Sequence, residues 1–226
     1  VAIVVVKQFF GGIGQNFVNP ALAGRIVLLT SFPVAMSTWT QPLTWTMSKL
    51  DGITSASPLS SIHEMTSGGA APDVSLVEML IGWRAGCLGE TCAVALILGG
   101  IYLVVRKVIS PTIPLTYIGT VAVIMLIAGK GDFRFVAYEL LGGGLMLGAI
   151  FMATDYTTSP ITFKGKIIFG IGCGLITSII RIFGNLPEGV SYSIIIMNIL
   201  VPLIENVTLP KPFGTPKKEK KEAEAK

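Results

Sequence analysis

The sequence predicts an all-α polytopic membrane protein, a helix bundle with an internal repeat and with broken or re-entrant helices. Hydrophobic residues make up 51% of the 226 residues and charged residues only 13%, a balance that is rare in soluble domains of this size. Long apolar blocks bounded by charge, glycine or proline are the second observation. Glycine- and proline-rich interruptions are the third, because broken helices are typical of transporters built from repeats.

Residues 1–36 are predicted to contain the end of an N-terminal span, followed by re-entrant and first helical segments. Val1 to Val6 resembles the last turns of a longer apolar helix, so we expect the chain to be part of a longer protein. The Gly-Gly-Ile-Gly run at 11–14 breaks the next stretch too strongly for one continuous helix. Residues 21–36 are apolar and about long enough for a short or broken span.

Residues 80–205 are predicted to form a five-helix membrane bundle. Glycines at four-residue spacing indicate close helix packing. An internal repeat is indicated where Gly86–Cys92 and Gly172–Ser178 share their Gly, Cys and Thr, and both duplication and chance similarity remain open. The five apolar blocks lie at 80–105, 112–129, 136–153, 166–183 and 190–205, and the glycine pairs are Gly82 with Gly86, Gly144 with Gly148, and Gly170 with Gly174.

The distribution of lysine and arginine predicts how the chain is oriented in the membrane, because short cytoplasmic loops carry these residues in excess. Residues 206–226 form a charged tail that we expect in the cytoplasm, together with the loops at 106–110 and 154–166. Residues 37–79 are expected on the extracytoplasmic side, since Lys49 is their only lysine or arginine. The net charge of +4 arises largely from the tail and predicts no nucleic-acid surface.

The polar loop 37–79 contains a segment of small and hydroxyl residues, Asp51-Gly-Ile-Thr54-Ser55-Ala-Ser57-Pro58. Proline after Ser57 favours an extended backbone at Ser57, which presents its hydroxyl to an enzyme that joins the oxygen to a phosphate. Two interpretations of the segment stay open. It is either an attachment site or an ordinary Ser/Thr/Gly turn.

This segment resembles the flavinylation motif of bacterial membrane redox pumps, and the chain as a whole resembles the D subunit of Rnf electron-transport complexes. The related B subunit of sodium-pumping NADH:quinone reductases shares the motif. The Ser-Phe-Pro-Val and Pro-Lys-Pro-Phe-Gly signatures favour Rnf. The family usually has Thr at the position of Ser57 and Gly at that of Ser55, but serine offers the same nucleophilic oxygen. Further segments that carry the resemblance are Lys7 to Gly12, Asn19 to Ala21, Gly86 to Thr91, Gly142 to Ala149, Ala153 to Asp155, Thr158 to Pro160 and Met197-Asn198.

The resemblance implies that Ser57 carries FMN through a phosphoester, with Asp51, Thr54 and Ser55 in the motif that a flavin transferase recognises. It also implies a noncovalent riboflavin and a urea-transporter-like fold. The implied protein is a multi-pass subunit in the bacterial cytoplasmic membrane, assembled with the A, B, C, E and G subunits of an Rnf-type complex. It would relay electrons in a ferredoxin:NAD⁺ oxidoreductase and couple them to Na⁺ or H⁺ export.

Two other functions are kept as alternatives: the B subunit of a sodium-pumping NADH:quinone reductase, and a non-redox urea-transporter-like solute channel. The flavinylation motif separates the channel from the redox subunits, because a channel has no need for it. The three cysteines lack the spacing of a zinc or iron–sulfur site, and no metal site is predicted.

Ionisable residues near apolar blocks supply the remaining site candidates. Arg84, Glu90 and Glu139 would each be costly against lipid, so we expect them to face the protein interior or a cavity. Arg84 either serves a flavin phosphate or extends to the membrane surface. Glu90 and Glu139 either line an ion path or are satisfied structural carboxylates. Asp155 either caps a turn at a helix end or contributes to the cofactor site.

Overall fold

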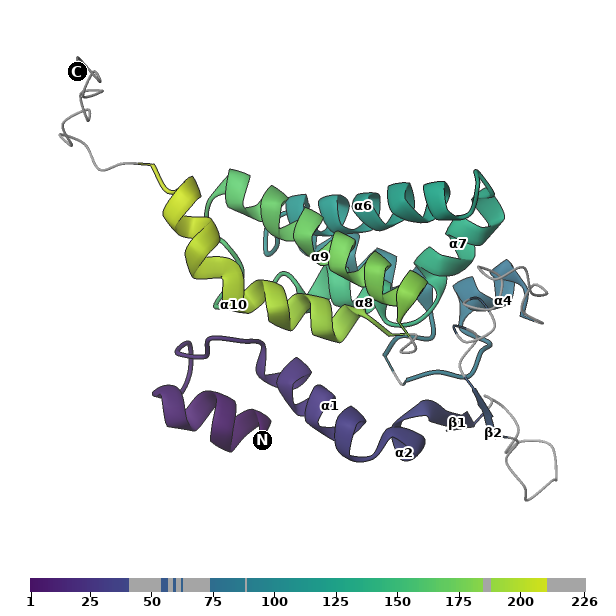
Figure 1. The fold of residues 1–226 in the computed structure, drawn as a ribbon, viewed down its shortest axis with the longest axis horizontal. Helices are drawn as coiled ribbons and strands as arrows, with labels where there is room; N and C mark the ends of the chain where they lie inside the picture. Colours follow the sequence, from purple (N-terminus) through teal and green to yellow (C-terminus); the bar gives the residue numbers. More distant parts are fainter. Residues whose placement is uncertain are drawn as a thin grey trace, which may run out of the picture.

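Helices α6 (Thr112–Ala128), α9 (Phe163–Phe183) and α10 (Val190–Thr208) lie against one another at the centre of the protein (Figure 1). The computed structural model describes residues 1–40, 54–56, 59, 62, 74–87, 89–184 and 188–210. These helices match the apolar blocks predicted at 112–129, 166–183 and 190–205. At 1.5 Å per residue, α9 is ~32 Å long, about the thickness of the hydrocarbon core.

Small residues hold α6 and α9 close together. Gly170 and Gly174 of α9 face Thr116 and Thr120 of α6, and a Cβ at either glycine would overlap the threonine. This confirms the packing role predicted for that glycine pair.

A buried hydroxyl cluster joins the three central helices. The hydroxyl of Tyr117 on α6 lies 2.6 Å from Thr177 Oγ1 on α9 and 2.9 Å from Ser193 Oγ on α10. Thr177 and Ser193 are themselves 2.8 Å apart, and all three side chains are buried. Because these groups have no access to water, their mutual hydrogen bonds define how the helices align.

The helix predicted over 136–153 is broken. Helix α7 (Phe133–Leu141) ends at Gly142, and the chain resumes in α8 (Leu145–Leu147) and the π-helical turn η3 (Gly148–Met152) after a bend of 66°. The prediction of one continuous helix was wrong because Gly143 has φ +60°, in the left-handed region that ends a helix.

The prediction of one helix over 80–105 was also wrong. Helix α4 (Leu76–Ile81) stops at Gly82, which has φ +103°, and α5 (Ala93–Val105) starts eleven residues after Gly82. A Cβ on Gly82 would lie 3.1 Å from Cys92 Cα, so this glycine ends a helix instead of packing within one. The predicted Gly82–Gly86 packing pair is therefore wrong, and Arg84 and Glu90 do not lie on a helix.

The two breaks lie side by side. Helix α4 contacts α7, while α5 contacts α8 and η3, so the corresponding halves of the two broken elements run together. The segment 82–92 consequently meets the turn 142–144, with Leu147 against Gly89. Backbone without regular helix at membrane depth is tolerated when protein surrounds it, and it is where transporter folds place their sites.

The N-terminal part forms a layer along α10 (Figure 1). It comprises η1 (Ala2–Lys7), η2 (Gln8–Phe10), α1 (Pro20–Ser31) and α2 (Pro33–Ser37). The predicted break at 11–14 is confirmed, since Gly11, Gly12 and Gly14 all have positive φ. Asn19 then starts α1 by accepting hydrogen bonds from the backbone N–H groups of Ala21 and Leu22.

A short hairpin follows α2. Strand β1 (Thr38–Thr40) pairs antiparallel with β2 (Thr54–Ala56), with Thr38 opposite Ala56. In Figure 1 this hairpin lies at the end of the molecule that also carries α4. The predicted polar loop 37–79 is otherwise mostly outside the described residues.

The loop at 153–162 contacts both the loop at 106–111 and the C-terminal end of α10. Tyr156 donates a hydrogen bond to the carbonyl oxygen of Val108, Ile161 N–H donates to Glu205 at 3.1 Å, and Thr162 bonds Thr208 at 2.8 Å. The turn between α6 and α7 lies at the opposite end (Figure 1). The loops predicted to share the cytoplasmic face thus lie together, while the orientation in the membrane remains a prediction.

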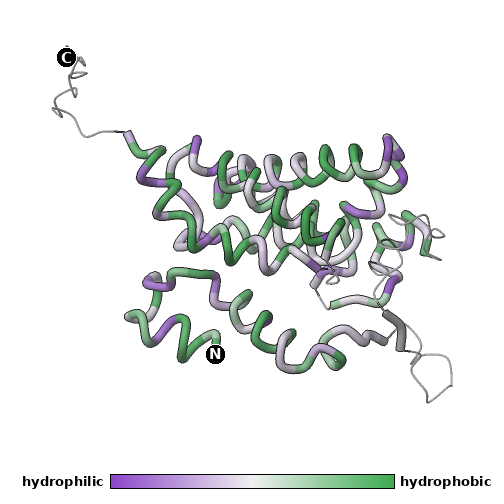
Figure 2. The backbone as a smooth tube through the Cα atoms, viewed as in Figure 1, coloured by the Kyte–Doolittle hydropathy of each residue, from purple (hydrophilic) through white to green (hydrophobic). Residues whose placement is uncertain are grey.

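The helices consist mostly of hydrophobic residues (Figure 2), and many of their large apolar side chains are exposed, as expected of a membrane protein. Within the described residues, two helices are long and apolar enough to cross a membrane, or three if α7 and α8–η3 count as one bent span. This confirms a helical membrane protein. The internal repeat gains no support from its two matched segments, because Gly86–Cys92 is irregular whereas Gly172–Ser178 lies within α9. The tail at 206–226 begins inside α10, and 211–226 is outside the described residues.

Candidate functional site

Part of the segment that resembles a flavinylation motif forms a strand. Thr54 and Ser55 belong to β2, where they pair with Thr40 and Trp39. Asp51 and Ser57 lie outside the described residues. The extended backbone expected of the motif is therefore present up to the residue before Ser57.

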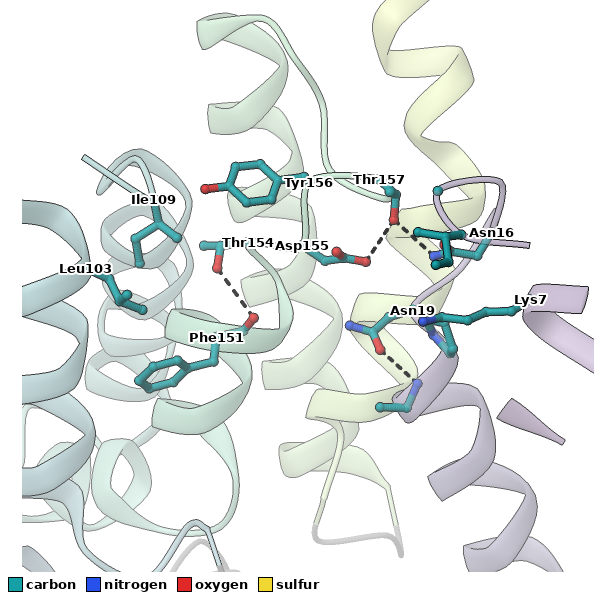
Figure 3. A pocket seen from close by; sticks show the side chains of 14 residues that line it. Lys7, Asn16, Asn19, Leu103, Ile109, Phe151, Thr154, Asp155, Tyr156 and Thr157 are labelled. Atoms are coloured by element: carbon teal, nitrogen blue, oxygen red, sulfur yellow. Dashed lines mark hydrogen bonds between the residues drawn. The ribbon is translucent and has the colours of Figure 1, made fainter. Parts of the chain in front are cut away.

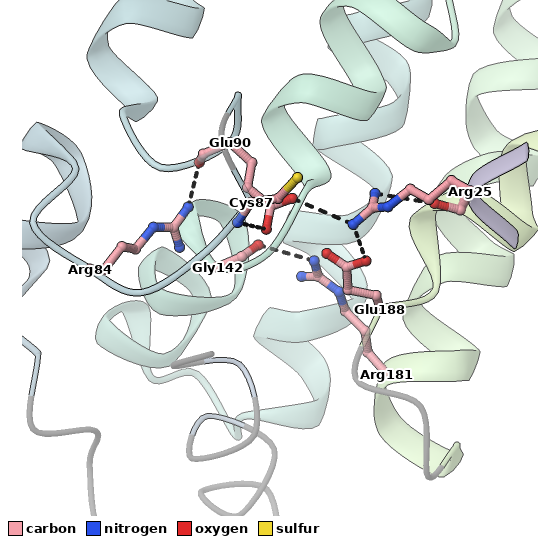
Figure 4. Close-up of polar contacts among 8 residues, drawn as sticks. Arg25, Arg84, Cys87, Glu90, Gly142, Arg181 and Glu188 are labelled. Atoms are coloured by element: carbon pink, nitrogen blue, oxygen red, sulfur yellow. Dashed lines mark hydrogen bonds and ion pairs between the residues drawn. The ribbon is translucent and has the colours of Figure 1, made fainter. Parts of the chain in front are cut away.

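A second candidate site lies where the two broken helices meet (Figure 4). Arginine and glutamate side chains from five parts of the chain converge there: α1, the segment 82–92, α7, α9 and the start of α10. We call this group the break cluster. Its members are Arg25, Arg84, Glu90, Glu139, Arg181 and Glu188.

Glu90 has one bonded and one unbonded carboxylate oxygen. Its Oε1 accepts a hydrogen bond from Cys87 N–H at 3.2 Å. Its Oε2 is buried and accepts no hydrogen bond from any described residue. The residue is 5% exposed, and the guanidinium of Arg25 lies 3.8 Å from Oε2. Burying a charged oxygen without a hydrogen bond is costly, so this atom is the first candidate for a ligand contact.

Arg25 binds the other carboxylate of the pair. Its Nη2 lies 2.5 Å from Glu188 Oε2, and its Nη1 donates to Ser191 at 3.4 Å. The same Nη2 faces Glu90. Arg25 and Glu188 are about one-fifth exposed, so this side of the cluster opens toward the surface.

Arg181 and Glu139 form a fully buried ion pair. Nη1 of Arg181 lies 2.8 Å from Glu139 Oε2 and also donates to the backbone oxygen of Glu139 at 2.6 Å. Nη2 donates to the backbone oxygen of Gly142 at 3.1 Å. These contacts fasten α9 to the end of α7, and they favour a structural carboxylate at Glu139 over a place on an ion path.

Arg84 holds the backbone of its own segment. It donates from Nη2 to the carbonyl oxygen of Glu90 at 2.7 Å and from Nε to that of Thr91 at 3.3 Å. Only 5% of it is exposed, so the expectation that it extends to the membrane surface was wrong. The hydrogen bonds to these carbonyl oxygens compensate for the positive charge of Arg84, so its side chain does not need to extend to solvent.

A cavity of about 550 Å³ lies at the opposite end of α1 (Figure 3). Its polar lining includes Lys7, Asn16, Asn19 and Asp155, and its apolar lining includes Phe151. Asp155 accepts hydrogen bonds from the hydroxyls of Thr157 and Thr158, each at 3.1 Å. Asn16 donates to Thr157 at 3.0 Å. Asp155 therefore stabilises a turn and also lines the cavity, while its contribution to a cofactor site stays a prediction.

Several site residues could not be recognised from the sequence. In the sequence, Arg25 is a single charged residue in the apolar stretch 21–36. An arginine in such a stretch usually pairs with a group inside the protein, but the sequence does not show which group. Asn16 had no predicted role, and Asn19 stood only in a segment that carries the family resemblance. Nothing in the sequence marks Glu188, because its partner is 163 residues away.

The fold and the site define a helical membrane protein whose two broken helices meet at a buried cluster of charges. The chain belongs to the NQR2, RnfD, RnfE family, whose model matches residues 1–214. It is 48% identical over 225 residues to the D subunit of the Na(+)-translocating ferredoxin:NAD(+) oxidoreductase complex of Acetobacterium woodii, covering 99% of this chain and 67% of the relative.

Two further relatives carry similar names. The chain is 42% identical over 226 residues to the D subunit of the proton-translocating ferredoxin:NAD(+) oxidoreductase complex of Clostridium ljungdahlii, covering 95% of this chain and 66% of the relative. It is 38% identical over 239 residues to the D subunit of the ion-translocating oxidoreductase complex of Stutzerimonas stutzeri, covering 94% and 68%. The chain thus spans about two thirds of these relatives, which are by name subunits of redox enzymes. The resemblance to D subunits is confirmed.

Proposed function

We propose that the protein is the flavin-carrying membrane subunit of a ferredoxin:NAD⁺ oxidoreductase complex, where it relays electrons and couples their flow to Na⁺ or H⁺ export. The similarity to D subunits over 99% of the chain carries this proposal. Because one relative is named for sodium and another for protons, the proposal includes both ions. The proposed partners are the A, B, C, E and G subunits of an Rnf-type complex in the bacterial cytoplasmic membrane, with the flavin loop extracytoplasmic and the C-terminus cytoplasmic.

The covalent flavin is proposed on Ser57. Strand β2 extends to Ala56, so the serine directly follows a backbone that is already extended. The flavin would supply electron-transfer chemistry when bound, while the chain positions it. A flavin transferase would join the serine oxygen to the FMN phosphate, with Asp51, Thr54 and Ser55 as its recognition residues.

Replacing Ser57 with alanine should abolish covalent flavin fluorescence, because alanine has no oxygen for the phosphoester. The measurement is in-gel flavin fluorescence of the denatured subunit, produced with its complex and a flavin transferase. Ser60→Ala is the matched control and should stay fluorescent. Fluorescence that persists in Ser57→Ala would place the attachment elsewhere, and a dark wild-type protein would reject the covalent flavin.

A noncovalent riboflavin is proposed in the cavity beside Asp155. The volume of about 550 Å³ lies in the range of small-molecule sites, and the lining combines an aromatic ring with amide and carboxylate groups. Asn16 and Asn19 offer donors and acceptors suited to the polar edge of a planar ring system.

The change Asp155→Asn should lower the riboflavin content of the purified complex about tenfold. Thr157 and Thr158 both donate to Asp155 Oδ2, and the neutral amide oxygen accepts each of these bonds more weakly than the carboxylate, by about 1 kcal/mol. The measurement is flavin released on denaturation and separated by chromatography. Asp132→Asn, at the opposite end of the molecule, should retain riboflavin. Equal contents in the two variants would exclude the cavity.

The two flavin assays also distinguish the proposed function from the alternative functions. The B subunit of a sodium-pumping NADH:quinone reductase would also carry covalent flavin, but the names of the relatives favour the Rnf-type D subunit. Two broken helices that meet would also suit a urea-transporter-like solute channel. A protein without flavin in either assay would favour that channel.

A further inference from the structure

The unbonded oxygen of Glu90 lies against the bare backbone of Gly144. A Cβ at Gly144 would lie 2.9 Å from Glu90 Oε2, 3.6 Å from Arg25 Nη1 and 3.7 Å from Glu188 Oε1. Any side chain at this position would therefore enter the gap between the three groups. The turn 142–144 thus provides a surface of bare backbone in front of two carboxylates (Figure 4).

The charges around this space leave one negative charge without an ion-pairing partner at hydrogen-bond distance. Arg25 is hydrogen-bonded to Glu188, and Arg181 is hydrogen-bonded to Glu139. Arg84 donates to backbone carbonyl oxygens, as far as the described residues show, and Cys87 contributes its backbone N–H. Glu90 is the carboxylate left without such a bond. The three arginines and three glutamates of the cluster balance one another, so a singly charged ion at Glu90 disturbs this neutrality less than a divalent ion does.

Arg25 is placed to compete for the same carboxylate. Its Nη2 is 2.5 Å from Glu188 Oε2 and 3.8 Å from Glu90 Oε2. A displacement of about 1 Å would bring it within the 2.7–2.9 Å of a charge-assisted hydrogen bond to Glu90. It comes from α1, in the N-terminal layer, while both carboxylates belong to other parts of the chain.

We propose that Glu90 Oε2 binds one exchangeable monovalent cation, a proton or Na⁺, and that Arg25 displaces this cation by moving from Glu188 to Glu90. When Arg25 holds Glu188, as in this structure, Glu90 accepts the cation. When Arg25 holds Glu90, the cation leaves and Glu188 loses its partner near the surface. The role of this exchange in ion export rests on the proposed function, whereas the site itself rests on the geometry.

Infrared difference spectroscopy of the purified complex tests the site without an activity assay. One arm replaces choline by Na⁺ at constant pH, and the other changes the pH in the absence of Na⁺. We expect a carboxylate band in at least one arm that is present in the wild type, lost in Glu90→Gln and retained in Glu139→Gln. A band in the Na⁺ arm identifies sodium, and a band in the pH arm alone identifies the proton.

Two further variants guard against misfolding. Glu90→Asp should keep a shifted band, and Gly144→Ala should raise the half-saturating cation concentration about tenfold or more, because its methyl group enters the space before Oε2. Each variant is compared only as an assembled complex with the same subunit composition as the wild type. The absence of any Glu90-dependent band in both arms of the wild type overturns the proposal. That result leaves the flavin assays unaffected, just as a protein without flavin would reject the proposed function without removing the band.

Discussion

Replacing Arg181 with alanine is expected to lower the free energy of unfolding by about 3–5 kcal/mol, the usual cost of removing one partner of a buried ion pair. Arg181 is 3% exposed and lies 2.8 Å from the carboxylate of Glu139. The substitution leaves that carboxylate buried without its cation. It also removes the donor from the backbone oxygens of Glu139 and Gly142, at the point where α7 breaks.

The measurement is the thermal unfolding midpoint of the purified protein in detergent. Arg134→Ala, on the exposed face of α7, is the matched control and should change stability by at most about 0.5 kcal/mol. The double variant Arg181→Met/Glu139→Met should recover part of the loss, because the two charges disappear together while the backbone oxygens still lack their donor. An Arg181→Ala protein as stable as the wild type would show that the ion pair does not stabilise the contact between α9 and the end of α7.

The helical class and the central helices were predictable from the sequence. Helices α6, α9 and α10 agree with their apolar blocks to within three residues at each end. Each is an apolar run without a strong helix-ending signal, although Pro202 lies within α10, and α9 and α10 are long enough to cross a bilayer. Such runs have few alternatives to a helix in hydrocarbon, because every backbone group must be bonded within the segment.

The broken helices were not predicted, because a window of high hydrophobicity does not show where a helix stops. Gly82, Gly86 and Gly89 with two charges between 82 and 92 were the local signal of the first break. Gly142-Gly143-Gly144 was the signal of the second. Gly82, Gly86 and Gly144 were interpreted as packing residues, and only φ angles such as +103° at Gly82 distinguish a helix end from a packing face.

Some residues of the candidate sites were predictable from the sequence, and others were not. Glu90 stood out because a carboxylate in an apolar block must have an interior role. The contact of Arg25 with Glu188 joins residues far apart in the sequence, and periodicity carries no information on it. The role of Ser57 came from a family resemblance and remains a prediction.

Substitutions at two neighbouring glycines of α9 should have very different effects on stability. At Gly174, a Cβ would lie 2.6 Å from Thr120 Cβ and 3.0 Å from the backbone oxygen of Tyr117. Neither atom moves easily, because Thr120 is hydrogen-bonded to the backbone of its own helix. At Gly172, the nearest atoms are the end of the Met197 side chain, 2.5 Å and 2.6 Å away, and a methionine can change rotamer.

We therefore expect Gly174→Ala to be about 1–3 kcal/mol less stable than Gly172→Ala. Alanine favours a helix over glycine by about 1 kcal/mol at both positions, so this contribution cancels in the comparison. The measurement is the thermal unfolding midpoint of the two variants in the same detergent. Equal midpoints would contradict the close approach of α6 and α9, because that approach places atoms that cannot move easily against Gly174, whereas Gly172 faces a flexible methionine.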